Sequence, residues 1–181
     1  MPPSVVKTIR DLVYWEYAKL ITGRAVGDRK NRPFCMHTFL KLRNGQIHPS
    51  TILRENHLLV EEGTEKCTYC GHYKSGLEWE HIIPTSRGGP DTIDNQVLAC
   101  RRCNAEKGDK CLYDWYGEER KYEIPRLAWG KYLKVIYDLH EQVGTLDSTC
   151  SRTNDLDCVL KRGRNKEKSW KRFSSRERAG E

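Results

Sequence analysis

The first part of the chain has apolar residues at helical spacing. In residues 5–21 they recur every three or four positions, which predicts a helix. Residues 34–42 predict a short helix or strand, since a turn containing glycine follows them. Residues 51–62 predict another helix, because Ser50 can cap its start. The sequence therefore predicts a helical N-terminal region over residues 1–66.

After this region the spacing of the apolar residues changes. Residues 77–83 and 96–99 have the composition of strands, and the turn-rich segment 85–94 between them predicts a hairpin. Residues 101–107 suit a short helix, because Gly108 follows its end. The expected order is strand, loop, strand and helix in one compact stretch.

A further amphipathic segment starts at Pro125 and runs to Val143, which predicts a last helix. Residues 148–181 are rich in Ser, Arg, Lys and Asn and poor in apolar residues, which predicts a disordered tail. Three basic residues of the helix lie opposite its apolar side, where we favour a solvated face over a stripe that faces DNA: Arg126, Lys131 and Lys134.

Composition limits the classes of protein that the chain can represent. Of its 181 residues, 37% are hydrophobic and 31% are charged, and no apolar run has the length of a membrane span. The first residues lack the features of a secretory signal, so we expect a cytoplasmic protein.

The net charge of +7 fits a polyanionic partner. Its distribution along the chain is uneven, however. Residues 148–181 hold ten Lys and Arg against five Asp and Glu, whereas the rest of the chain holds 22 against 20. A nucleic-acid surface on the folded part therefore has to come from local clusters of basic residues.

Four of the eight cysteines form two Cys-x-x-Cys pairs, Cys67 with Cys70 and Cys100 with Cys103. Two such pairs can place four thiolates around one tetrahedral zinc ion, whereas a redox pair is the competing interpretation. A four-cysteine zinc site has no open coordination position, so it holds the fold and the chemistry must lie elsewhere. The remaining cysteines are expected to be free thiols: Cys35, Cys111, Cys150 and Cys158.

The segment between and after the cysteine pairs carries several spaced motifs. It contains Leu-Glu-Trp-Glu-His-Ile-Ile-Pro at residues 77–84, Ser-Arg-Gly-Gly at 86–89, Asp-Asn-Gln-Val at 94–97 and Cys-Asn-Ala-Glu-Lys-Gly at 103–108. Together these motifs resemble the HNH endonuclease family over residues 67–110.

The resemblance implies a ββα-metal fold and a role for each matching residue. His81 is then the general base, and Glu80 and Asn104 hold a catalytic divalent ion. Asn95 braces the hairpin and orients His81, and Lys107 touches a phosphate. Asn104 stands where many members of the family have a final His, and Glu80 stands where Asp is more usual, so the chain resembles an HNN variant.

General chemistry supports these assignments independently of the family. Phosphodiester hydrolysis needs a base for water and a cation for the developing charge. A neutral imidazole, with an ordinary pKa of about 6.5, can take the proton of an attacking water. A carboxylate and an amide oxygen are hard ligands suited to Mg²⁺ or Mn²⁺. Neighbours on a strand point to opposite faces, however, so Glu80 and His81 can share a site only if the strand bends between them.

Three arginines near the motif are candidates for contact with nucleic acid. Arg87 and the two glycines after it could meet a phosphate, with a simple turn as an equal alternative. Arg101 and Arg102 lie beside the second cysteine pair, where they could contact the backbone of a nucleic acid.

We therefore expect an α+β fold whose hairpin and helix are held by a four-cysteine zinc site and flanked by N-terminal helices and a C-terminal helix. The expected function is a metal-dependent endonuclease that acts on DNA, with RNA as a less favoured partner, a Zn²⁺ ion for structure and Mg²⁺ or Mn²⁺ for catalysis. The alternatives are a catalytically inactive zinc-stabilised module that binds DNA or RNA and, less favoured, a redox protein. The expected division of the chain is 1–66 (helical region), 67–110 (HNH motif), 111–147 (C-terminal helical region) and 148–181 (basic tail).

Overall fold

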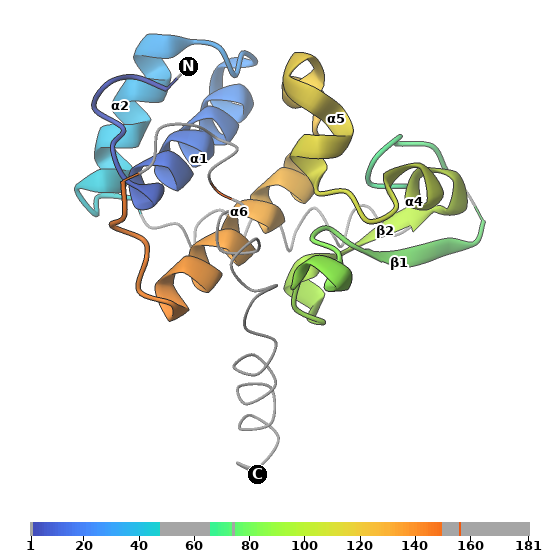
Figure 1. The fold of residues 1–181 in the computed structure, drawn as a ribbon. Helices are drawn as coiled ribbons and strands as arrows, with labels where there is room; N and C mark the ends of the chain where they lie inside the picture. The colour runs from blue at the N-terminus through green and yellow to red at the C-terminus, as the bar shows by residue number, and fades with distance from the viewer. Residues whose placement is uncertain (1, 48–65, 74, 150–155, 157–181) are drawn as a thin grey trace.

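The computed structural model describes residues 2–47, 66–73, 75–149 and 156. Within these residues the fold combines helices with one antiparallel sheet of two strands, and the expected α+β class is confirmed. The elements in chain order are α1 (Ile9–Val26), α2 (Arg32–Arg43), β1 (Leu77–His81), η1 (Thr85–Arg87), η2 (Ile93–Asn95), β2 (Gln96–Cys100), α4 (Arg101–Lys107), α5 (Leu112–Arg120), η3 (Lys121–Glu123) and α6 (Arg126–Gln142) (Figure 1).

Helix α1 lies at the centre of the helical part of the molecule, against α2 and α6 (Figure 1). It begins at a capping box, in which Thr8 Oγ1 accepts the Asp11 N–H at 3.1 Å and the Asp11 carboxylate accepts the Thr8 N–H. Its Tyr17 side chain is buried, and the Tyr17 hydroxyl donates to the Gly130 carbonyl of α6 at 3.2 Å. Apolar packing together with this hydrogen bond fixes α1 on α6.

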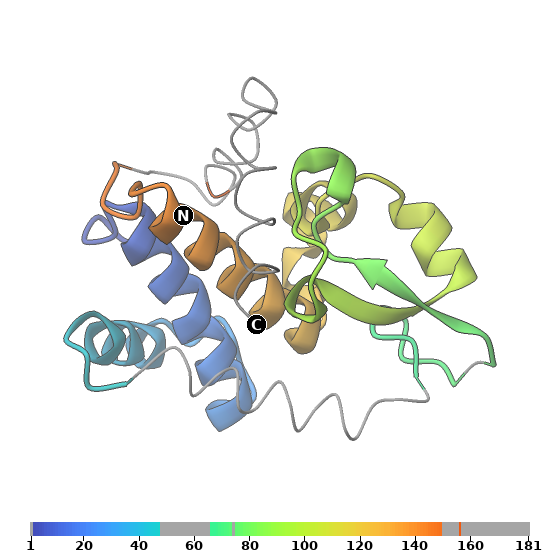
Figure 2. The same cartoon turned by 90° about the horizontal axis from the view of Figure 1, so that it is seen from below.

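The hairpin and α4 form the second part of the molecule, on the opposite side from α1 and α2 (Figure 2). Strand β1 pairs with β2 so that Glu80 is opposite Val97 and His81 is opposite Gln96. Helix α4 starts directly at the end of β2 and ends at Lys107, with Gly108 as its C-cap. The predicted order of strand, loop, strand and helix is therefore confirmed.

One hydrophobic core joins the two parts. Ile83, after β1, and Val97 of β2 are buried in the same cluster as the apolar residues of α1 and α6. Lys131 of α6 adds a polar link, since its ammonium donates to the carbonyl oxygens of Ile93 and Gln96, both at 2.8 Å. The helices therefore support the loop and the strand at the end of the hairpin.

The expectation of a solvated basic face on α6 was wrong for Lys131, which is buried because its ammonium satisfies these carbonyl oxygens. Arg126 donates to the Leu20 carbonyl at 3.1 Å, and Lys134 bonds to Asp94 at 2.8 Å. These basic residues fasten α6 to its neighbours.

Other expectations had mixed outcomes. Residues 34–42, left open between helix and strand, belong to helix α2. Helix α5 was not predicted. The helix expected over residues 51–62 lies outside the described residues, as does all of the tail except residues 148, 149 and 156. No helix in the described ranges is both long and apolar enough for a membrane span.

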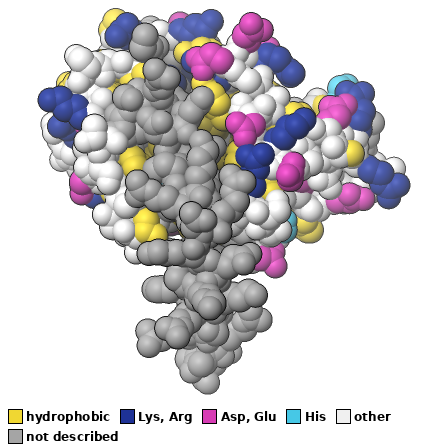
Figure 3. All heavy atoms as spheres, in the orientation of Figure 1, with side chains coloured by type: hydrophobic (Ala, Val, Ile, Leu, Met, Phe, Trp, Pro, Cys, Tyr) yellow, Lys and Arg dark blue, Asp and Glu magenta, His cyan; other side chains and the backbone are white. Residues whose placement is uncertain are grey.

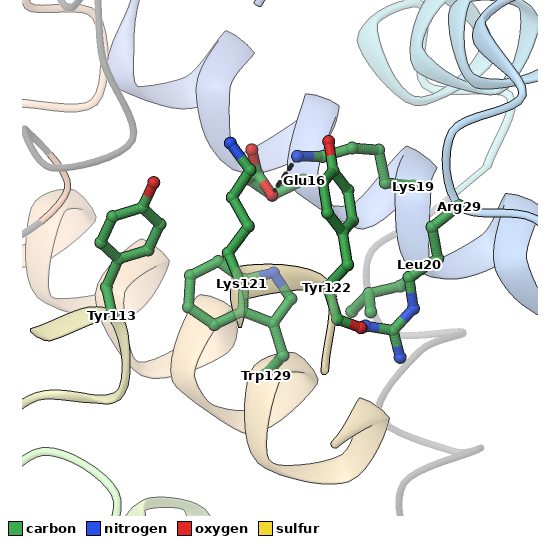
Figure 4. Close-up of a pocket in the computed structure, with 8 residues that line it drawn as sticks. All are labelled: Glu16, Lys19, Leu20, Arg29, Tyr113, Lys121, Tyr122 and Trp129. Carbon is green, nitrogen blue, oxygen red and sulfur yellow. Dashed lines mark hydrogen bonds and ion pairs between the residues drawn. The ribbon is translucent and has the colours of Figure 1, made fainter. Parts of the chain in front are cut away.

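A small cavity lies between α1, η3 and α6 (Figure 4). The Glu16 carboxylate at its wall is buried and lies 2.6 Å from Lys19 Nζ. The ammonium groups of Lys19 and Lys121 lie 5.6 Å and 5.4 Å from the centre of the Tyr122 ring. Because these charges have partners within the fold, we assign the cavity a packing role.

Candidate active site

The four motif cysteines meet at one point beside the hairpin. Their sulfur atoms all lie within 4.8 Å of one another, and Cys70 Sγ is 3.9 Å from Cys100 Sγ. A tetrahedral zinc ion with bonds of about 2.3 Å places its sulfur ligands about 3.8 Å apart, whereas a disulfide needs about 2.05 Å. The cluster therefore fits a structural zinc site.

The start of α4 favours a thiolate in this cluster. The backbone N–H of Cys103 lowers the pKa of Cys100 to about 7, and burial raises the pKa of Cys103 above its usual range. Four sulfurs this close repel one another when ionised, so full ionisation requires a cation between them. This donor set is suited to zinc.

The two faces of the hairpin have different surroundings. Glu78 and Glu80 alternate with Trp79 and His81 along β1, so the two carboxylates lie on the face covered by α4. His81 lies on the other face, where Trp79 is 53% exposed. Both residues keep their partners on β2, so no bulge interrupts the pairing between Glu80 and His81.

Glu80 is buried, with 4% of its surface exposed, and both oxygens of its carboxylate have partners. Lys107 Nζ lies 2.5 Å from Glu80 Oε1, and the Tyr69 hydroxyl donates to Glu80 Oε2. Lys107 Nζ also donates to the His81 carbonyl oxygen at 2.8 Å. Burial and the neighbouring Glu80 carboxylate hold the pKa of Tyr69 well above its usual range, which keeps its hydroxyl a donor.

These contacts do not test the roles predicted for Glu80 and Lys107. Lys107 and Tyr69 bond to the two oxygens of the Glu80 carboxylate, and the Lys107 side chain is fully buried against Glu80. An ammonium and a carboxylate placed under α4 neutralise each other away from water. The metal-ligand role of Glu80 and the phosphate contact of Lys107 stay predictions.

Asn104 of α4 lies beside a carboxylate to which sequence reasoning assigned no role. Asn104 Nδ2 donates to Glu78 Oε2 at 3.3 Å, and the Glu78 side chain is 44% exposed. Glu78 is two residues before Glu80 and therefore shares its face of β1. This alternation was the signal that could have identified Glu78 as a candidate ligand.

The imidazole of His81 is partly exposed and lies beside two polar side chains. His81 Nε2 lies 2.9 Å from Asp91 Oδ1 and 3.1 Å from Gln96 Nε2. The ionised Asp91 carboxylate can only accept, so Nε2 carries the proton and the Gln96 amide donates to Asp91 instead, at 3.1 Å. The neutral ring then has its lone pair on Nδ1. Sequence reasoning did not identify Asp91, because its position beside His81 follows from closure of the hairpin loop.

Asn95 closes that loop from inside. Its fully buried side chain accepts the Ile83 N–H at 2.9 Å and donates to the carbonyl oxygens of Ile83 and Pro90, both at 2.9 Å. Gly89 packs against the same group, since a Cβ on Gly89 would lie 2.0 Å from Ile83 O. Asn95 and Gly89 thus hold the backbone directly after His81.

The three candidate arginines have different surroundings. Arg87 Nη1 bonds to Asp114 of α5 at 2.8 Å, which ties the loop to the helices. The side chains of Arg101 and Arg102 are 89% and 76% exposed. Figure 3 shows basic and acidic side chains mixed over one face of the molecule, in line with the near-neutral charge of the folded part. Arg101 and Arg102 remain candidates for contact with a polyanion.

Together, a four-cysteine cluster, a hairpin with a partly exposed histidine and a short helix define a ββα-metal segment. Residues 67–110 match the family described as HNH endonuclease, so the resemblance found in the sequence is confirmed. The chain is also 33% identical over 75 residues to the CRISPR-associated endonuclease Cas9 of Corynebacterium diphtheriae. That stretch covers 40% of this chain but 7% of the Cas9 chain. None of the solved structures matches the chain significantly.

Proposed function

We propose that this protein is a metal-dependent endonuclease that hydrolyses phosphodiester bonds in DNA. The observation that carries the proposal is the placement of His81: a partly exposed imidazole on an HNH hairpin, held at Nε2 by Asp91. A base that is exposed to substrate and fixed by a carboxylate suits general-base catalysis.

In this proposal His81 takes the proton of the attacking water on Nδ1, because Asp91 keeps the proton of the neutral ring on Nε2. Asn95 acts on His81 through the backbone: its side chain holds Ile83, and its carbonyl oxygen accepts the Ile82 N–H at 2.8 Å. Arg101 and Arg102, at the start of α4, attract the phosphates of the substrate.

The residues on the α4 face fit a hard divalent ion. Asn104 offers an amide oxygen once its side chain turns over, and Glu78 offers an exposed carboxylate 3.3 Å away. We therefore propose Glu78, whose other carboxylate oxygen lies 3.5 Å from Arg101 Nε, as a ligand in addition to the predicted ligand Glu80. When bound, Mg²⁺ or Mn²⁺ supplies positive charge to the scissile phosphate and the leaving oxygen. The four-cysteine cluster holds zinc and has a structural role.

A cleavage panel tests this function. The full chain is incubated with supercoiled plasmid, single-stranded DNA and RNA, each with Mg²⁺, Mn²⁺ or EDTA. We expect nicked or linear plasmid with either metal and intact plasmid in EDTA. Intact DNA under every metal condition, with binding retained in a gel-shift assay, would instead favour the inactive zinc-stabilised module.

Calorimetry tests the ligand assignment independently of cleavage. Titration of the zinc-loaded protein with Mn²⁺ should show a site that Glu78→Ala and Asn104→Ala each remove. Arg102→Ala, which changes an exposed side chain on the same helix, should leave the site intact and serves as the control. A Mn²⁺ site that persists in both ligand variants would show that the ion binds elsewhere.

A further inference from the structure

Strand β1 presents a large aromatic ring to solvent at Trp79, which is 53% exposed. Three other tryptophans, Trp15, Trp115 and Trp129, each pack against an aromatic ring of the fold, whereas no ring of the described residues lies against Trp79. An indole offers a broad flat apolar surface. The fold leaves much of this surface open to a partner.

The position of Trp79 relates it to His81. The two residues are two positions apart on β1, so their side chains share one face and start about 6.5 Å apart along the strand. On β2, the half-buried Leu98 is opposite Trp79, and Gln96 is opposite His81. Trp79 and Leu98 therefore form an apolar surface that continues directly to the imidazole proposed as the general base.

The charge of the folded part favours a partner that binds by stacking. Residues 1–147 hold 22 Lys and Arg against 20 Asp and Glu, whereas non-specific binding of duplex DNA depends on the neutralisation of its phosphates. A base that stacks on an aromatic ring adds affinity without charge, and every base has a face that can stack. In a duplex a base has to leave its stack first, which costs least when it is already unpaired.

We propose that Trp79 stacks on the base of a nucleotide next to the scissile phosphate, so that the substrate of this site is DNA with an unpaired nucleotide at the cut. A base on Trp79 brings the adjoining phosphate beside the His81 imidazole, because the two side chains share one face of β1. The position of the cut rests on the proposed nuclease function, whereas stacking on Trp79 does not. Supercoiled plasmid stays a substrate, since negative supercoiling favours local unpairing.

Binding without cleavage tests the stacking. Zinc-loaded full-length protein, without added Mg²⁺ or Mn²⁺, is titrated with a single-stranded oligonucleotide and with the blunt duplex of the same sequence. In Trp79→Leu the Kd for the single strand should rise about tenfold, because one stacked base is lost, while the Kd for the duplex changes less than about twofold.

Two variants separate stacking from packing. Trp79→Phe keeps an aromatic ring and should restore most of the affinity for the single strand. Tyr122→Leu removes an exposed ring from the helical part of the molecule and should bind both DNAs like wild type. An unchanged Kd for the single strand in Trp79→Leu, or equal losses for single strand and duplex, would overturn the proposal.

Cleavage tests where the stacked base lies. Two duplexes of one sequence are compared, one fully paired and one with a single unpaired nucleotide. We expect wild type to cut at the phosphate next to the unpaired nucleotide and Trp79→Leu to raise KM about tenfold at nearly unchanged kcat. An abasic residue at the unpaired position should raise KM for wild type but not further for Trp79→Leu.

Equal cutting of the two duplexes by wild type would contradict the proposal. If wild type cuts neither these duplexes nor plasmid DNA, the proposed function fails, and the binding comparison still decides whether Trp79 stacks on an unpaired base.

Discussion

Replacement of Asn95 by Ala tests how the loop behind His81 is held. The side chain of Asn95 is 0% exposed and makes three hydrogen bonds, one to the N–H of Ile83 and two to the carbonyl oxygens of Ile83 and Pro90. Ala keeps the backbone conformation available but removes all three bonds. Ile83 is itself fully buried, so water cannot readily replace the lost partners.

The expected loss of stability follows from these contacts. Each buried hydrogen bond contributes about 0.5–1.5 kcal/mol, and a buried group left without a partner costs more, so the free energy of unfolding should fall by about 3–5 kcal/mol. In a chain of this size about 1 kcal/mol lowers the melting temperature by about 2–4 °C, which gives a fall of roughly 6–20 °C.

Asn104→Ala is the matched control, because Asn104 makes one hydrogen bond of 3.3 Å to the half-exposed Glu78. Urea denaturation of both variants measures the difference. Asn95→Ala should lose stability, whereas Asn104→Ala should stay within about 1 kcal/mol of wild type and lose the divalent ion. A loss below about 1 kcal/mol in Asn95→Ala would refute the role assigned to its three bonds.

Three further predictions concern neighbouring features. Gly89→Ala would place a Cβ 2.0 Å from the Ile83 carbonyl oxygen and should lower the free energy of unfolding by about 3 kcal/mol. Gly88→Ala, at a φ of +87° with open space around it, should lower it by about 1 kcal/mol. Equal urea midpoints for the two variants would contradict the close approach of Gly89 to Ile83. Asp91→Asn should lower kcat at least about tenfold without a change in melting temperature, because it removes the carboxylate that fixes the tautomer of His81. An unaltered kcat would show that Asp91 has no part in the mechanism. Cys100→Ser should lower both zinc content and melting temperature, and a full equivalent of tightly held zinc in this variant would argue against a four-sulfur site.

Features set by local spacing were predictable from the sequence. The ends of α4 follow from Gly108 and from the strand before it, and they agree with the structure. The two Cys-x-x-Cys pairs bring four sulfurs together as their spacing suggests. Helix α5 escaped prediction because Gly117 at its centre, with a φ of 71° and a ψ of 172°, interrupts the helical pattern.

The partners of individual side chains could not be predicted in the same way. A lysine in the last turn of a helix is usually solvated, yet Lys107 is buried because the packing of α4 on β1 brings Glu80 to it. The same packing separates Glu80 from the face of His81 and places Glu78 beside Asn104. Motif spacing thus indicates the kind of site, whereas the contacts of each side chain depend on strand alternation and helix packing.

Single-turnover cleavage of plasmid DNA by wild type and by His81→Ala, in Mg²⁺ and in Mn²⁺, tests the central claim most directly. His37→Ala, an exposed histidine on α2, serves as the control. If His81 activates water, the rate constant of His81→Ala should fall by about a hundredfold or more at unchanged DNA binding, while His37→Ala cuts like wild type. Equal rates for wild type and His81→Ala would contradict the assignment of His81 as the base.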